Sequence, residues 1–317
     1  MESQVRSNVH AVLRQVANIK TRQSWTGSSA TSNVALLAMM RFSTTVIAMH
    51  AINDKPSGAA VPPDAINALH HAERVVFFTG AGMSAESGIA TFRDVQSGLW
   101  AKFKPEELAS PEGWQEDRAR VWAWYEWRRS LVRRAQPNAG HLAIASIALT
   151  KQVTVVTQNV DDLHERGGSA NALHLHGSLF KSRCGTCGHP SSWKGEPFGS
   201  DAGAVIERLT PPRCTRCLGY VRPGVVWFGE MLPQEVWDQA ELAIKACDML
   251  VVVGTSGVVY PAAGLVTQAL NADKFVLEIN PQNSGPADTN KNTDANILKW
   301  RTTAAVGLPA MARTLKP

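Results

Sequence analysis

The sequence predicts an α/β protein built on a parallel sheet, with a small inserted module that binds metal. Two observations predict the sheet: short apolar runs alternate with helical stretches, and each run ends in small or polar residues. Two Cys-x2-Cys pairs, 26 residues apart, interrupt this rhythm and predict the module. With 317 residues, the chain is long enough for one large domain or two small ones.

Residues 1–60 differ in composition from the rest. They contain six Lys or Arg residues against two acidic ones, and no residue between Ser3 and Asn53 is acidic. This composition resembles a mitochondrial transit peptide, so we expect residence in mitochondria. The alternative is a disordered extension or a wrongly assigned start codon, with residence in the cytoplasm or nucleus. Arg41 interrupts the apolar run 34–52, and a central Arg costs about 2.5–3.5 kcal/mol in a membrane, so no stable membrane insertion is expected.

The rest of the chain carries nearly balanced charge, because residues 1–60 account for most of the net charge of +5. A basic surface that binds nucleic acid is therefore not expected on the body. Five cysteines, four of them at metal-ligand spacing, suit a reducing compartment and argue against a secreted disulfide scaffold.

The body begins with a helix and continues with four strands. We expect the helix over Ala65–Ala72 with Asp64 as its N-cap, after the Pro62-Pro63 step. The apolar runs predict strands at Val75–Thr79, Val153–Thr157, Met249–Val253 and Phe275–Ile279. Ligands of open α/β sheets bind outside the carboxyl ends of the strands, so all four strand ends are candidate ligand contacts.

The turn Gly80–Gly88 follows the first strand and opens a helical stretch. We expect its backbone N–H groups to be free to meet a pyrophosphate, with the dipole of the helix behind them. The spacing Gly80-x-Gly82-x5-Gly88 is not the usual Gly-x-Gly-x2-Gly, and no acidic residue ends the second strand. Taken alone, the turn is equally compatible with an ordinary tight turn.

The cysteine pairs predict one structural Zn2+, bound by Cys184, Cys187, Cys214 and Cys217. Four thiolates close the coordination shell, so this zinc is not expected to take part in a reaction. A zinc ribbon that binds nucleic acid is the alternative. The surrounding interval is poor in periodicity and is expected to be held by metal rather than by a core. Cys247 is expected to be an ordinary buried thiol.

Five ordered motifs resemble those of the sirtuins. They are Gly80–Arg93, Gln158–Asp161, His174–Gly177, Val226–Glu230 and Gly254–Ser256. The resemblance runs from about Asp64 to near the C-terminus and implies a Rossmann-type domain with a small zinc-binding and helical insertion domain. It also implies NAD-dependent removal of acyl groups from lysine in proteins or peptides, with transfer to ADP-ribose and release of nicotinamide.

The resemblance also implies domain limits. The catalytic domain is expected over 61–317, with a Rossmann core at about 73–98, 150–180 and 222–310. The helical insertion is expected at about 99–149 and the zinc module at about 181–221.

By the same resemblance His176 matches the catalytic base, which takes a proton from ribose hydroxyls of NAD. Asn159 and Asp161 match the catalytic pair that orients the ribose, a water and the nicotinamide carboxamide. His174 is expected to be structural or exposed. The other implied NAD contacts are Gly80, Ala81, Gly82, Ser84, Glu86, Phe92, Arg93, Gln158, Gly254, Thr255, Ser256, Asn280 and Ala304.

A Tyr-x2-Arg pair, Tyr125 and Arg128, predicts which acyl group is removed. The two residues share one face of a helix. The pair resembles the class III sirtuins, where it reads the carboxylate of malonyl- and succinyl-lysine, and glutaryl-lysine fits the same chemistry. The alternative is an aromatic core stripe with a solvated Arg, as is expected for Arg129, Arg133 and Arg134.

The segment Val225–Glu230 is expected to supply a strand edge on which the substrate peptide adds a strand. Its expected substrate contacts are Val225, Val226, Trp227 and Phe228. Gly224 stands where a bulkier residue is common in the family, and a relaxed acyl tunnel is expected from it.

Three other functions remain compatible with the motifs. Plain NAD-dependent deacetylation differs only in the role of Tyr125 and Arg128, and protein ADP-ribosylation would use the same NAD site. A zinc-stabilised module that binds NAD as a sensor ligand is the alternative from another class. The presence of both His176 and Asn159 argues against this last function.

Overall fold

A computed structural model describes residues 60–90, 103–170, 172–191, 193, 207–281 and 297–315, all within one compact unit, Ile52–Pro317. The predicted transit peptide lies outside the described residues, apart from Ala60, and mitochondrial residence stays a prediction. Phe92 and Arg93 also lie outside them. None of the described helices has the length and apolar character of a membrane span.

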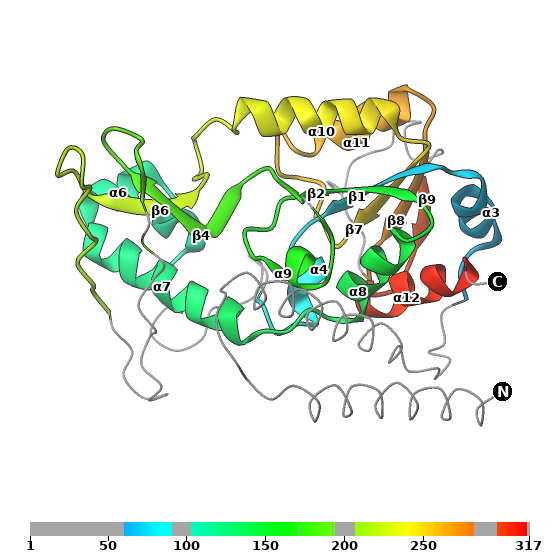
Figure 1. The fold of residues 1–317 in the computed structure, drawn as a ribbon, viewed down its shortest axis with the longest axis horizontal. Coiled ribbons are helices and arrows are strands. Elements are labelled where there is room, and N and C mark those ends of the chain that lie inside the picture. The colour runs from blue at the N-terminus through cyan, green and yellow to red at the C-terminus, as the bar shows by residue number, and fades with distance from the viewer. Residues whose placement is uncertain are drawn as a thin grey trace, which may run out of the picture. The chain divides into compact units, whose positions relative to one another are not determined.

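A six-stranded parallel sheet forms the larger layer (Figure 1). Its strand order is β3-β2-β1-β7-β8-β9. The bounds are Arg74–Thr79 for β1, Gln152–Thr157 for β2, Leu173–His174 for β3, Met249–Val253 for β7, Phe275–Ile279 for β8 and Ile297–Trp300 for β9. The four predicted strands are confirmed, and all four lie at the centre of the sheet. The strand order reverses at β1, which is the switch point where such sheets bind ligands.

Helices cover both faces of this sheet, because the side chains of β1 alternate between two cores. Phe77 packs with α3 (Pro63–His71), α8 (Ala139–Ile147) and α12 (Ala304–Thr314). Phe78 points to the other face, which α10 (Gln234–Ala246) and α11 (Gly264–Asn271) cover. Figure 1 shows α10 and α11 along one side of the sheet and α8 and α12 along the other.

Two sequence-based boundaries are wrong here. Helix α3, which was predicted over Ala65–Ala72, begins at Pro63, and Pro62 occupies its N-cap position. Asp64 therefore lies in the first turn, where it interacts favourably with the helix dipole without capping the helix. The predicted helical insertion, 99–149, extends too far, because α8 is buried against the sheet and against α12.

A smaller unit contains an antiparallel sheet of order β5-β4-β6, formed by β4 (Gly177–Cys184), β5 (Pro190–Ser191) and β6 (Val221–Val225). Three helices pack beside it: α5 (Pro105–Leu108), α6 (Pro111–Glu116) and α7 (Arg118–Arg134). The module therefore begins at Gly177 rather than 181, and it includes β6, which the sequence assigned to the Rossmann core.

The small sheet and α7 share one hydrophobic core, which contradicts the expectation that metal alone holds the module. Trp122 and Trp124 of α7, Leu179 of β4 and Val221 of β6 are all buried in it, together with Cys184. These apolar side chains come from parts of the chain that are distant in sequence, and they pack together only in the folded protein.

Arg129 is buried inside this unit and is not solvated as predicted. Its guanidinium pairs with Glu126 and donates to the carbonyl of Leu179 at 2.5 Å and to Ser182 Oγ at 3.1 Å. Glu126 lies one helical turn away on α7, whereas Leu179 and Ser182 belong to β4. The ion pair therefore fastens the helix to the small sheet.

Candidate active site

The carboxyl ends of β1, β2, β7 and β8 converge at one edge of the large sheet. Gln158, which follows β2, donates its amide N–H to Thr255 Oγ1 at 3.0 Å. Asn280, which follows β8, donates to the carbonyl of Thr255 at 2.8 Å. Thr255 itself follows β7, and Gly80 after β1 donates its N–H to Val253 at 2.9 Å. Four loops distant in sequence thus meet around the Gly254–Ser256 turn.

The glycine loop is not the row of free donors that the sequence predicted. The N–H groups of Gly80, Gly82, Met83 and Ser84 donate to carbonyls of the protein at 2.8–3.1 Å. The helix that follows, α4 (Gly82–Ala85), is a single turn and adds little dipole. A Cβ at Gly82 would lie 2.7 Å from Gly254 Cα, so glycine is required because two backbone loops pack directly on each other.

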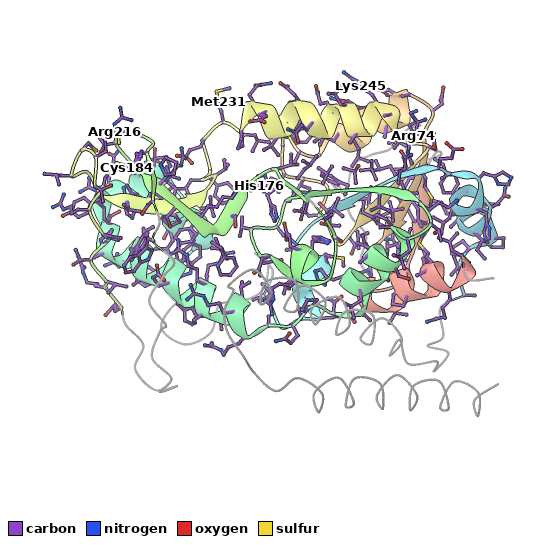
Figure 2. The ribbon with its side chains drawn as sticks, viewed as in Figure 1. Arg74, His176, Cys184, Arg216, Met231 and Lys245 are labelled. Atoms are coloured by element: carbon purple, nitrogen blue, oxygen red, sulfur yellow. The ribbon has the colours of Figure 1, made fainter. Side chains whose placement is uncertain are left out.

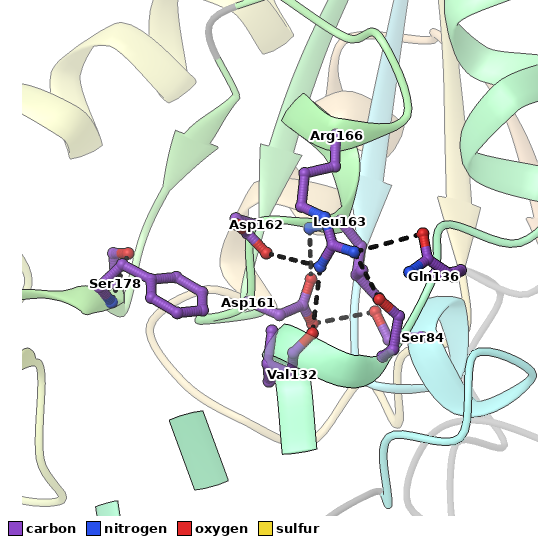
Figure 3. A network of polar contacts seen from close by, with 10 residues as sticks. Ser84, Val132, Gln136, Asp161, Asp162, Leu163, Arg166 and Ser178 are labelled. Carbon is purple, nitrogen blue, oxygen red and sulfur yellow. Dashed lines mark hydrogen bonds and ion pairs between the residues drawn. The ribbon is translucent and has the colours of Figure 1, made fainter. Parts of the chain in front are cut away.

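Asn159 and Asp161 meet at Ser84. Asn159 Nδ2 donates to Gly80 O at 3.0 Å and to Ser84 Oγ at 3.2 Å, and Ser84 Oγ donates to Asp161 Oδ2 at 2.9 Å. The other oxygen of Asp161 accepts the N–H of Leu163 at 3.1 Å (Figure 3). Burial raises the pKa of Asp161, and these hydrogen bonds oppose the rise. The cluster fixes both candidate side chains before any ligand arrives.

His176 is held in one tautomer by a backbone carbonyl. Its Nδ1 lies 3.0 Å from Gln158 O, and since a carbonyl only accepts, Nδ1 carries the proton. The Nε2 atom is then a lone-pair base. Burial lowers the pKa of His176, with the Gln158 hydrogen bond acting against it, so the neutral base is the stable form at pH 7.

His174 has a different environment, which agrees with the structural role expected for it. Its two ring nitrogens contact acceptors, Asn159 O at 2.9 Å and Glu165 Oε1 at 2.7 Å. Burial alone lowers its pKa, but the hydrogen bond to Glu165 reverses the direction, and the pKa of His174 is raised. The His174 ring therefore links the backbone of Asn159 to Glu165.

A buried chain of hydroxyl groups supports the backbone of Asn159, and this chain was not predicted from the sequence. The N–H of Asn159 donates to Thr157 Oγ1 at 3.0 Å, and Thr79 Oγ1 donates to the same oxygen at 2.8 Å. His164 Nε2 lies 2.9 Å from Thr79 Oγ1. The sequence does indicate such a chain, because a Thr is the last residue of both β1 and β2, which are neighbours in the sheet.

Helix α9 (Leu163–Arg166) connects this cluster to the small unit. Arg166 donates to the carbonyls of Val132 at 3.1 Å and Ala135 at 2.5 Å, at the C-terminal end of α7 (Figure 3). A guanidinium satisfies carbonyls that the helix leaves unpaired. The C-terminal end of α7 is thus held beside the loop that carries Asp161.

Glu86 and Ala304 lie at the same edge, where they join the glycine loop to α12. The carboxylate of Glu86 accepts from Thr303 Oγ1 at 3.0 Å and from the N–H of Ala305 at 2.9 Å. It therefore caps the helix that begins at Ala304. Ala81 and Ser256 are partly exposed in the two loops that meet here.

Tyr125 and Arg128 lie on α7, on the side of the small unit that faces Asp161. Tyr125 is 1 % exposed, and its oxygen accepts from Trp227 Nε1 at 2.9 Å. The Arg128 guanidinium carbon lies 4.9 Å from the ring centre of Trp124 and 5.7 Å from that of Tyr125. Burial lowers the pKa of Arg128, and the interactions with Tyr125 and Asp161 oppose this shift without reversing it. Arg128 is half-buried near Asp161 and is not a solvated surface residue.

The predicted strand edge does not extend over Val226–Phe228, because β6 ends at Val225. The N–H of Val226 donates to His176 O, that of Phe228 to Ala109 O, and that of Trp227 to Glu230 Oε2, each at 2.9 Å. These three N–H groups are not available to a peptide.

Gly224 is required by the packing of the small sheet, and the relaxed acyl tunnel expected from it stays a prediction. A Cβ at Gly224 would lie 2.8 Å from the backbone of Lys181, so the glycine permits β4 and β6 to approach each other.

The four predicted metal ligands form one cluster. The sulfur atoms of Cys184, Cys187, Cys214 and Cys217 all lie within 4.8 Å of one another, and this donor set fits one tetrahedral Zn2+. Backbone N–H groups support two of the thiolates, Thr186 donating to Cys184 Sγ at 3.3 Å and Arg216 to Cys214 Sγ at 3.4 Å.

The four-cysteine cluster and His176 lie at opposite ends of β4 (Figure 2). The length of this strand, about 25 Å, separates them. The zinc is structural. Cys247 is buried, as predicted, with its thiol on Ile244 O.

Comparisons with known proteins agree with this architecture. Residues 80–261 match the family model described as "Sir2 family". The NAD-dependent protein deacylase 2 of Corynebacterium efficiens is 46% identical over 257 residues, which cover 79% of this chain and 96% of that protein.

Two solved structures extend the comparison. The crystal structure of a Sir2 homologue in complex with NAD has a TM-score of 0.70 at 38% identity, and the match covers 81% of this chain and 94% of the other. A Sir2 structure with a deacetylated p53 peptide and 3′-O-acetyl ADP-ribose has a TM-score of 0.63 at 25% identity, covering 80% and 96%. The chain belongs to the Sir2 family, the sirtuins.

Proposed function

We propose that this chain is an NAD-dependent protein-lysine deacylase that prefers acyl groups ending in a carboxylate, namely succinyl, malonyl and glutaryl groups. The acyl group passes from lysine to ADP-ribose, and nicotinamide is released. The names of the relatives support the deacylase activity. The position of Arg128 and Tyr125 supports the preference for acidic acyl groups.

The residues at the sheet edge fit NAD by the chemistry of their donors and acceptors. Neutral amides and hydroxyls suit ribose hydroxyls and a carboxamide, and these come from Ser84, Gln158, Asn159, Thr255, Ser256 and Asn280. Asp161 adds a carboxylate whose hydrogen bond from Ser84 fixes its orientation. NAD, when bound, supplies the ADP-ribosyl group that accepts the acyl chain.

His176 acts as the general base. Its Nε2 lone pair is directed away from the Gln158 carbonyl, and its depressed pKa keeps that nitrogen free of a proton at pH 7. Asn159 and Asp161 need no large movement to orient a ligand, because Ser84, Gly80 and Leu163 already hold them.

The observation that carries the acyl preference is a half-buried cation beside a buried phenol. Arg128 lies over the rings of Trp124 and Tyr125, where a carboxylate would bind a planar guanidinium and a hydroxyl together. An acetyl group offers no acceptor at this place and gains nothing from the guanidinium. The site therefore selects acyl chains with a terminal carboxylate.

Matched kinetics test the proposal. The chain is given NAD and one peptide carrying succinyl-, malonyl- or acetyl-lysine, and kcat/KM is compared for Arg128→Met and for Arg134→Met, an exposed arginine of the same helix. Arg128→Met should lower the succinyl-to-acetyl ratio roughly 10- to 100-fold, the effect of a lost charged hydrogen bond. Arg134→Met should keep the ratio.

If the parent prefers acetyl-lysine and Arg128→Met changes nothing, the enzyme is a plain deacetylase. Nicotinamide release without peptide deacylation would indicate ADP-ribosylation instead.

A further inference from the structure

The indole of Trp227 determines which way the Tyr125 hydroxyl can donate. Trp227 Nε1 lies 2.9 Å from the Tyr125 oxygen, and the two side chains are 2 % and 1 % exposed. An indole nitrogen only donates, so the phenol oxygen is the acceptor and its own proton must point elsewhere. Burial raises the pKa of Tyr125 to about 12, so the hydroxyl keeps its proton at neutral pH.

Contacts to the ring and to the backbone of Trp227 hold the indole in place. The guanidinium carbon of Arg222 lies 3.3 Å from the ring centre, and the Trp114 ring packs at 5.7 Å between centres. The backbone N–H of Trp227 donates to Glu230 at 2.9 Å, and Glu230 forms an ion pair with Arg222. Arg222 also donates to the carbonyl of Val225 at 3.0 Å. These contacts set the direction from which the donor approaches Tyr125.

We infer that Trp227 is a specificity-determining positioning residue, whose N–H aims the Tyr125 hydroxyl at the carboxylate of an acyl group held by Arg128. This inference rests on the function proposed above. A carboxylate accepts hydrogen bonds and donates none, so only a hydroxyl with its proton directed outward stabilises it. The Trp227 N–H already bonds a lone pair of the phenol oxygen. The hydroxyl hydrogen of Tyr125 therefore does not have to be oriented when the acyl group binds.

This role differs from backbone pairing with a peptide, which was expected for Trp227 from the sequence. Its backbone N–H is bonded to Glu230 and its side chain to Tyr125, so both of its donors act inside the protein. An acetyl group presents no acceptor to the phenol. The contribution of Trp227 should therefore appear in the ratio of the two substrates.

The test compares Trp227→Phe in the parent and in the Tyr125→Phe background, with succinyl- and acetyl-lysine on one peptide. In the parent, the succinyl-to-acetyl ratio of kcat/KM should fall roughly 3- to 10-fold, the effect of one neutral hydrogen bond. In the Tyr125→Phe background, the same change should leave the ratio unaltered, because the two residues act as one unit. The control Trp122→Phe trims another buried tryptophan of the same core, whose ring packs on Trp193, and it should keep the ratio.

The outcomes separate this inference from the proposed function. If the parent prefers succinyl-lysine but Trp227→Phe leaves the ratio unchanged, or lowers it equally without Tyr125, the role of Trp227 is overturned and the proposed function stands. If the parent shows no preference for a carboxylate, both fall together. Should Trp227→Phe fail to fold, benzothienylalanine at this position replaces only the N–H by sulfur, and the same fall in the ratio is required.

Discussion

Replacing Arg129 by Met should destabilise the protein strongly, although its neighbour Arg128 is the residue assigned to substrate. Arg129 and Glu126 are each 1 % exposed. Arg129 donates to Glu126, to Leu179 O and to Ser182 Oγ, and Trp193 Nε1 donates to Glu126 at 3.1 Å. One oxygen of Glu126 has no hydrogen-bond partner among the described residues. Without Arg129, Glu126 would retain the single donor of Trp193.

The magnitude follows from the buried carboxylate. Removal of one partner from a buried ion pair costs about 3–5 kcal/mol, because the remaining charge is left without its counter-charge. For a domain of this size, each kcal/mol lowers the unfolding temperature by about 2–4 °C. The Arg129→Met variant should therefore unfold about 6–20 °C below the parent.

Thermal unfolding followed by circular dichroism measures this shift. Arg134→Met is the matched control, since an exposed charge on the same helix changes stability by no more than about 0.5 kcal/mol. Adding Glu126→Gln to Arg129→Met removes the stranded charge and should restore part of the loss. The reasoning is refuted if Arg129→Met unfolds within 2 °C of the parent, or if the second substitution destabilises it further.

Two further predictions concern His176 and the metal. Burial lowers the pKa of His176 below 6.5, and the neutral imidazole is the base, so kcat/KM should be constant near pH 7 and fall as the pH is lowered through that depressed pKa. A fall in kcat/KM that begins above pH 6.5 on acidification would contradict this role. Zinc analysis should find about one Zn2+ per chain, and a chelator should remove it and lower the unfolding temperature. Cys187→Ser should lose the metal and Cys247→Ser keep it, whereas unchanged unfolding of the metal-free protein would show that the shared core alone holds the module.

Local pattern predicted the features that depend on neighbouring residues. The central strands β1 and β7 are buried on both faces, so each appears in the sequence as an apolar run such as Met249–Val253. Thr154 interrupts the run of β2 and Glu278 that of β8, but the apolar residues around them still predict a strand. The two-residue β3 and β9 (Ile297–Trp300) lie at the edges of the sheet, where less burial leaves a weaker signal. The zinc ligands were predictable because two thiolates of each pair must reach one metal ion across a fixed short turn.

The sequence by itself determined the fold class, the metal ligands and the order of the motifs, because periodicity, spacing and strand-end chemistry are local properties. Only the tertiary structure decided which polar groups are already bonded. It showed the glycine-loop N–H groups in use, Arg129 buried in an ion pair, and Trp227 bonded to Tyr125, 102 residues away. Adjacent residues on a helix point about 100° apart. The contacts of each side chain therefore depend on helices and strands that distant parts of the chain contribute.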